Sequence, residues 1–140
     1  MAVPDEVGKR IEIEAPIERV WAALTTSDGL LSWLPTHRAE MELRPGGLPS
    51  LAWAGDADEG IVGVVEPPHR LVFRWRPVGR ERPYTTVTFT LHDLSGRNEL
   101  TLVESRFTSL PKRIQRQSWE GNDRGWSEEL TELKMALEAA

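Results

Sequence analysis

Glu104 is the clearest candidate for chemistry in this sequence, because it continues the apolar face of a predicted strand. In residues 99–107, Leu100 and Leu102 alternate with surface residues, and Glu104 falls on their side. A carboxylate in an apolar interior needs hydrogen-bond donors, a charged partner or water, or else it takes up a proton. Arg106, next on this face, could pair with it. Three roles stay open for Glu104: an ion pair near the strand end, a polar anchor for a ligand, or a general acid or base.

The histidines and serines give weaker signals. His37 follows a predicted short helix, close to where a cavity would open, and is a second candidate anchor for a ligand; His69 and His92 are typical surface histidines. No histidine pair has metal-ligand spacing, no serine lies in a G-x-S-x-G elbow, and Gly46-Gly47 lacks the context of a phosphate loop. The sequence therefore predicts no metal, no cofactor and no nucleotide site, and it identifies no catalytic residue.

Tryptophan is the most informative residue type here. The chain has six tryptophans against one tyrosine and three phenylalanines. Each tryptophan buries on the order of 150–250 Å² and needs a partner for its indole N–H. Such residues form either an aromatic core or the wall of an aromatic cavity, and composition does not separate the two. The candidate wall residues, apart from the polar anchors Glu104 and His37, are Trp33, Trp53, Trp75, Phe89, Trp126 and Leu130.

The order of predicted elements is strand, two short helices, a long series of strands, and a helix. Alternation predicts a strand over residues 8–15, and helical spacing predicts helices over 16–26 and 28–34, the second capped by Ser27. Further strands are expected within residues 38–47, 50–55, 59–77, 83–94 and 99–107, with turns at Pro45-Gly46-Gly47 and residues 95–98. The last helix is expected to begin at Asn122 or Asp123, which places Glu128 and Glu129 near its positive end.

The apolar stripe of this last helix, formed by Trp126, Leu130, Leu133 and Leu137, predicts a lid over the sheet. Clean alternation in the strands predicts an antiparallel sheet with one dry face. A twisted sheet curls, so a straight helix laid across it leaves space beneath. We therefore expect an α+β fold in which a curled antiparallel sheet of six to seven strands wraps a long C-terminal helix. Residues 1–140 are expected to form a single domain, with 1–7 as a loose extension.

Several strings resemble one known family when taken together: "IEAPIERVWAALT", "LRPGG", "VVEPPHRLVFRWR" and "NDRGWSEELTELKMALE". They are similar to activators of the ATPase of the ninety-kilodalton heat-shock chaperone, within the START and polyketide-cyclase-like superfamily. The resemblance covers about residues 8–139. It implies the helix-grip fold, with a cavity between sheet and C-terminal helix that takes apolar or amphipathic small molecules.

Charge and composition narrow the possible partners. The net charge of −5 has both signs interspersed, which disfavours nucleic acid. There is no cysteine, no signal-peptide pattern and no run of 18 apolar residues, so we expect no disulfides, no membrane insertion and a cytoplasmic location. The sequence does not decide between a monomer and a homodimer.

The function favoured by these observations is binding of a hydrophobic small molecule rather than catalysis. One alternative is a cyclase-like or dehydratase-like enzyme in which Glu104 or His37 transfers a proton. Another is a co-chaperone-like interaction module, for which the basic residues of Lys112–Arg116 are the one local feature and which the family resemblance also allows.

Overall fold

A seven-stranded antiparallel sheet forms the body of this computed structural model, which describes residues 2–34, 38–53, 56–78 and 82–139, except for the side chains of Trp53 and Asp56. The strand order is β1-β7-β6-β5-β4-β3-β2. The strands are β1 (Val7–Ile13), β2 (Arg38–Glu40), β3 (Ser50–Trp53), β4 (Asp56–Glu66), β5 (Arg70–Pro77), β6 (Thr85–Asp93) and β7 (Asn98–Ser105). The helix-grip architecture expected from the sequence is confirmed, since this curled sheet holds a long C-terminal helix.

Alternation along the central strands separates the two faces of the sheet. In β7, burial alternates strictly from Asn98 to Ser105, and Leu100, Leu102 and Glu104 are all fully buried. The register places Glu104 opposite Val87 of β6 on one side and Val7 of β1 on the other. A carboxylate is thereby fixed in the middle of three apolar strands, which is where the period-2 pattern predicts it.

Two short helices follow β1, as the sequence predicts. They are α1 (Ile17–Thr25), which begins after Pro16, and α2 (Ser27–Leu31). The cap of α2 is Thr26 rather than the expected Ser27: its hydroxyl accepts a hydrogen bond from the Gly29 amide at 2.9 Å. Thr26 has extended backbone angles, which suit a capping residue, whereas Ser27 is already helical.

The strand expected in residues 38–47 ends early, because the chain turns there. β2 stops at Glu40, and Gly46 and Gly47 exchange hydrogen bonds with Val62 of β4 at 2.8 Å each. A Cβ on Gly47 would lie 2.1 Å from the carbonyl oxygen of Glu42, so only glycine fits this close approach. The predicted turn at Pro45-Gly46-Gly47 is thus present and closes onto the bulged strand β4.

The last helix, α3 (Lys112–Glu138), is longer than expected. It begins directly after Pro111 and the short 3-10 helix η1 (Phe107–Ser109), ten residues before the predicted start. Ile114 and Trp119 pack against the core, and this tertiary contact extends the helix through Gly121. The prediction that Asn122 or Asp123 caps the helix, with Glu128 and Glu129 near its positive end, was therefore wrong.

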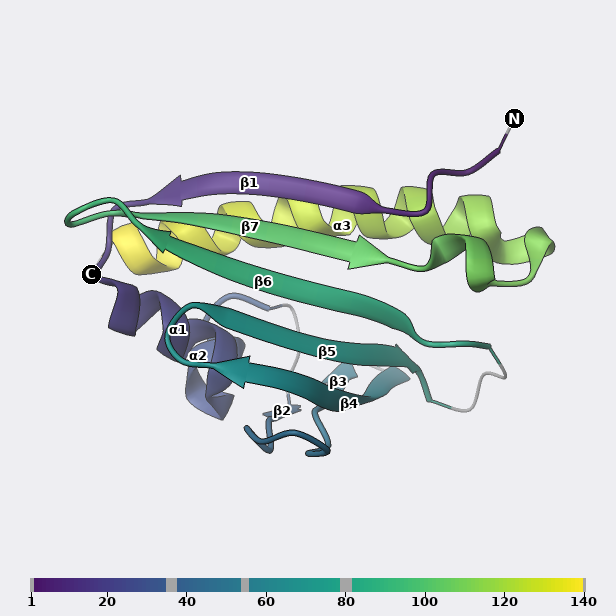
Figure 1. The fold of residues 1–140 in the computed structure, drawn as a ribbon, viewed down its shortest axis with the longest axis horizontal. Coiled ribbons are helices and arrows are strands. Elements are labelled where there is room, and N and C mark those ends of the chain that lie inside the picture. The colour runs from purple at the N-terminus through teal and green to yellow at the C-terminus, as the bar shows by residue number, and fades with distance from the viewer. Residues whose placement is uncertain (1, 35–37, 54–55, 79–81, 140) are drawn as a thin grey trace.

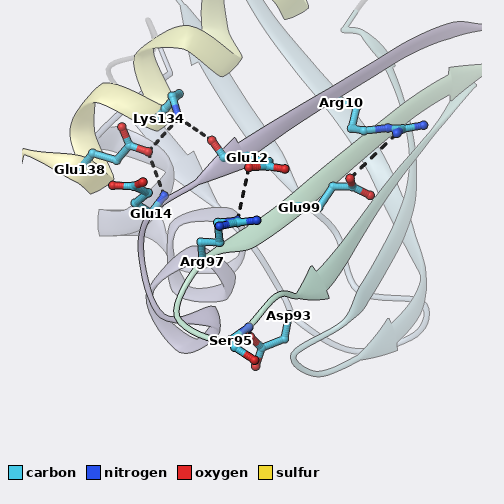
Figure 2. Close-up of polar contacts among 9 residues, drawn as sticks. All are labelled: Arg10, Glu12, Glu14, Asp93, Ser95, Arg97, Glu99, Lys134 and Glu138. Atoms are coloured by element: carbon cyan, nitrogen blue, oxygen red, sulfur yellow. Dashed lines mark hydrogen bonds and ion pairs between the residues drawn. The ribbon is translucent and has the colours of Figure 1, made fainter.

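Contacts at both ends hold α3 against the strand β1. Figure 1 shows α3 running behind β1 and β7, with α1 and α2 near its C-terminal end. There, Glu138 accepts hydrogen bonds from the Glu14 amide and from Lys134, both at 2.8 Å (Figure 2). These two donors hold the pKa of Glu138 below its usual range, the Glu14 amide first. At the other end, the indole of Trp119 donates to the Glu6 carbonyl oxygen at 2.9 Å.

Surface ion pairs flank this C-terminal attachment. Arg97, in the turn before β7, lies 3.3 Å from the Glu12 carboxylate of β1 (Figure 2). Exposed pairs of this kind contribute little stability individually. Among the described residues, no helix combines the length and apolar character needed to cross a bilayer.

Candidate functional site: a buried carboxylate beside two cavities

Glu104 is completely buried and accepts hydrogen bonds from four side chains. Its Oε2 accepts from Thr85 Oγ1 at 2.6 Å and from Trp75 Nε1 at 3.0 Å. Its Oε1 accepts from Trp126 Nε1 at 2.8 Å, and Asn122 Nδ2 lies 2.9 and 3.1 Å from the two oxygens. Every partner is a donor, which matches the acceptor-only character of a carboxylate. Two indole N–H groups are satisfied by the same anion.

Four elements converge to build this arrangement. Trp75 comes from β5 and Thr85 from the first residue of β6, whereas Asn122 and Trp126 are four residues apart on α3 and so share one face of the helix. Glu104 is therefore a polar tie between the sheet and α3. Removing either side of the tie would leave polar groups buried without partners.

The expected ion pair between Glu104 and Arg106 is absent. Arg106 is exposed and has a left-handed backbone with φ of 75°, from which the chain turns into η1 and leaves the face occupied by Glu104. In the described part of the chain, no cation forms a salt bridge with Glu104. Neutral N–H and O–H donors replace a counter-ion here, which is how a buried carboxylate avoids most of its desolvation penalty.

Aromatic rings surround the carboxylate on its cavity side. The rings of Trp75 and Trp126 stack with centroids 5.7 Å apart, and Phe89 meets Trp126 edge-on at 5.9 Å. Phe73 continues the cluster, 5.7 Å from Trp75 and 6.2 Å from Phe89. Because both indole N–H groups point to Glu104, the orientations of the two stacked rings are fixed by hydrogen bonds as well as by packing.

These rings leave little room beneath them. The inner cavity, which they line together with residues of α1, α2 and β3, has a volume of about 20 Å³. That is space for roughly one water molecule. Its lining residues are Leu24, Leu30, Trp33, Leu34, Met41, Pro49, Leu51, Asp58, Glu59, Phe73, Trp75, Phe89 and Trp126. The space expected under the helix is therefore largely filled by the protein's own side chains.

A larger and partly open space, the outer cavity, lies on the other side of the same indoles. Its volume is about 190 Å³, and it shares Asp58, Trp75 and Trp126 with the inner cavity. The remaining lining residues are Arg76, Pro77, Arg82, Gly121, Asn122, Gly125 and Glu129. A Cβ added to Gly121 or Gly125 would meet no atom within 4 Å, so on the α3 side two bare glycines border the opening.

Glu129 is the titratable group most changed by this environment. Its pKa is raised to about 7, first by burial and then by the nearby charges of Glu104, Asp58 and Glu128, in that order of importance. Among the described residues it has no hydrogen-bond or ion-pair partner. A carboxyl group poised near neutral pH at the edge of a cavity can exchange a proton or bind a cation there.

The family is decided by comparison with known proteins. Residues 14–138 match the model of the family described as "Activator of Hsp90 ATPase homolog 1-like protein". The chain belongs to this family. Comparison with curated protein sequences gave no significant match.

Solved structures similar to this family member share its fold over nearly the whole chain. A protein of the dynemicin biosynthetic locus, DynU16, has a TM-score of 0.81 at 26% identity; the alignment covers 96% of this chain and 48% of that one, so the chain spans about half of its length. A protein of Rhodobacter sphaeroides has a TM-score of 0.82 at 26% identity, covering 96% of this chain and 93% of that one. The Aha1 dimer of Colwellia psychrerythraea has a TM-score of 0.77 at 23% identity, covering 94% and 95%.

The residues singled out from the sequence fall into three groups in this Hsp90-activator-like chain. Trp75, Phe89, Trp126 and Glu104 come together at one place. Trp33 lines the inner cavity from the side of α2 and donates its indole N–H to the Ala23 carbonyl oxygen at 2.8 Å; Leu130 is buried next to this region on α3. Trp53 lies in β3, but its side chain, like all of His37, falls outside the described residues.

Three polar residues of the site were missed. Thr85 and Asn122 complete the hydrogen bonding of Glu104, and Glu129 borders the outer cavity. The available signal was the spacing of Asn122, Trp126 and Glu129 at four and three residues, which places them on one helix face. In the described residues, no group of three or more His, Cys, Asp or Glu side chains is placed to hold a metal ion.

Proposed function

We propose that this protein binds a small apolar or amphipathic molecule between the sheet and α3, with Trp75 and Trp126 as the cavity walls. The observation that carries the proposal is the outer cavity of about 190 Å³, which reaches the same indoles that close the inner cavity. Apolar ligand surface buried against these rings contributes roughly 25 cal/mol per Å². Glu104 serves as the anchor that holds both indoles in place.

The two helix glycines support this proposal. Glycine in a helix interior destabilises it by about 1 kcal/mol relative to alanine. Gly121 and Gly125 line the outer cavity, and neither is required by a close contact, since a Cβ at either position meets only open space. Access to the cavity is a reason for bare backbone at this place in α3.

The enzymatic alternative that uses Glu104 is less well supported. Glu104 lines neither cavity, and both of its oxygens are engaged by donors from the protein. A ligand in the outer cavity is separated from this carboxylate by Trp75, Asn122 and Trp126. Proton transfer from Glu104 would first require this tie to open.

Binding of N-phenylnaphthylamine, a neutral apolar fluorophore, tests the proposal. We expect saturable binding by the wild-type chain and a loss of at least about tenfold in affinity for Gly125→Leu, whose side chain would fill the outer cavity. Ser127→Leu introduces the same side chain at an exposed position two residues away and should bind like wild type. Circular dichroism of both variants checks folding. Lack of saturable binding by the wild-type chain, or equal affinity in Gly125→Leu, would contradict the proposal.

A further inference from the structure

We propose that the ligand of the outer cavity carries a positively charged amine, bound beside Trp75 and Trp126 with its nitrogen at the Glu129 carboxylate. This inference rests on the proposed function and specifies the class of molecule that the cavity takes. The inference is based on the charged residues that line the outer cavity and on the contacts that each of them makes.

The two arginines of the outer cavity are already engaged by the protein. Arg76 donates to the Glu59 carboxylate at 3.4 Å and to the Arg82 carbonyl oxygen at 3.1 Å, and its guanidinium lies 4.3 Å from the centre of the Tyr84 ring. Arg82 donates to Ser118 Oγ at 3.2 Å. Binding an anionic ligand through the Arg76 guanidinium would disrupt these contacts, which the protein makes internally.

Glu129 is in the opposite situation. It lies partly buried on α3 and has neither a hydrogen bond nor an ion pair within the described ranges. A charged carboxylate taken out of water without a partner is unfavourable, and a ligand cation would remove this penalty. Among the charged residues that line the outer cavity, Glu129 is therefore the one that a cationic ligand would stabilise most.

The surroundings of Glu129 increase this preference for a cation. Glu104 of β7, Asp58 of β4 and Glu128 of α3 all act on it with negative charge, which together with burial gives it a pKa of about 7. A second, open depression beyond Glu129 is lined by Glu128 and Glu132 together with Trp33. Negatively charged groups of β4, β7 and α3 thus act on the Glu129 carboxylate, while Arg76 and Arg82 are the positively charged residues that line the outer cavity.

Aromatic rings next to carboxylates are also the usual surroundings of bound ammonium groups. A cation near an indole face gains about 0.5–2 kcal/mol from the ring quadrupole. Trp75 and Trp126 provide such rings, and the partly open volume of about 190 Å³ encloses a single aromatic ring with a short chain, whereas a larger probe such as N-phenylnaphthylamine extends through the opening. An arylalkylamine has both features.

Three matched probes test the charge preference on the intact chain: phenethylamine, phenethyl alcohol and hydrocinnamate, which carry a positive, a neutral and a negative end group. Titration followed by calorimetry and by the indole N–H NMR signals of Trp75 and Trp126 should rank the amine first, about tenfold above the alcohol, with the anion weakest. An alcohol or anion that binds as well as the amine would overturn the inference. So would failure of the amine to bind to a chain that binds N-phenylnaphthylamine, and in both cases the proposed function would survive.

The variant Glu129→Gln tests whether Glu129 causes the preference for the amine over the alcohol. We expect this variant to bind amine and alcohol equally while it retains its affinity for N-phenylnaphthylamine. Glu120→Gln removes the same charge from an exposed position of α3 outside both cavities and should keep the preference of the wild type. If Glu129→Gln keeps the full preference for the amine, the assignment to Glu129 is overturned.

The pH dependence provides an independent readout. The amine stays protonated through the range, whereas Glu129 ionises near neutral pH. Affinity for phenethylamine should therefore rise about tenfold between acidic and mildly alkaline solution, and affinity for phenethyl alcohol should not. An amine affinity that is independent of pH would contradict the role given to Glu129.

Discussion

At the level of single residues, the position of Glu104 was predictable but its partners were not. Alternation along residues 99–107 places the carboxylate inside the protein, and Glu104 is fully buried. The four donors come from three other elements, and which of their side chains meet depends on how α3 lies across the sheet. Such long-range geometry is not encoded in any local pattern, so the nearest basic residue in sequence, Arg106, was the wrong partner.

Glu129 gives the protein a pH-dependent stability of unusual sign. Its pKa is raised from 4.5 to about 7 in the folded chain, so between these values the folded state binds more protons than the unfolded state. This contribution is fully present at low pH and is lost as the pH rises through 7. We expect the free energy of unfolding to fall by about 2 kcal/mol on this account between pH of about 5 and 8.

Urea denaturation at the two pH values measures this effect by comparing wild type with Glu129→Gln, which cannot ionise. Between the two pH values, the free energy of unfolding of the variant should fall by about 2 kcal/mol less than that of wild type. The variant should therefore be more stable than wild type at the higher pH. Glu120→Gln, exposed on the same helix, should follow the wild-type curve. If the free energy of unfolding changes with pH by the same amount in wild type and in Glu129→Gln, then Glu129 titrates alike in the folded and unfolded chain.

At the level of elements, the strands were predicted more accurately than the last helix. Period-2 alternation reports directly which side of a sheet is buried, and β5, β6 and β7 fall where it places them. The first ten residues of α3 carry mixed polar residues and end in Gly121, which locally indicates a helix beginning later. Packing of Ile114 and Trp119 on the core overrides that local signal.

The glycine at position 121 is the testable consequence of this longer helix. It lies in the interior of α3, and a Cβ there meets no atom within 4 Å. Gly121→Ala should therefore raise the free energy of unfolding by about 1 kcal/mol, and the melting temperature by several degrees, because alanine lowers the entropy lost on helix formation. Thermal unfolding followed by circular dichroism measures this. Gly47→Ala is the matched comparison, where the same change should destabilise, since a Cβ there would lie 2.1 Å from a carbonyl oxygen.

At the level of the whole molecule, the space under α3 can either be filled by side chains or be left open. The family resemblance implies a cavity between sheet and helix, and the fold that it implies is present. In this chain, however, the inner cavity holds about 20 Å³, because Trp75, Phe89 and Trp126 occupy the rest. Sequence reasoning could not decide between filled and open space, because six tryptophans fit either. That outcome depends on ring orientations, which the hydrogen bonds to Glu104 fix.

Trp126→Leu tests this alternative directly. The variant loses one of the donors to Glu104 and a large ring between the two cavities, so we expect it to be less stable by about 3 kcal/mol. The same change joins the inner and outer cavities, so N-phenylnaphthylamine should bind more tightly than to wild type, by about tenfold. Trp119→Leu, a tryptophan of α3 that lines neither cavity, should lose stability without gaining affinity. Equal affinity in the two variants would mean that Trp126 does not divide the binding space, and that a ligand occupies the outer cavity alone.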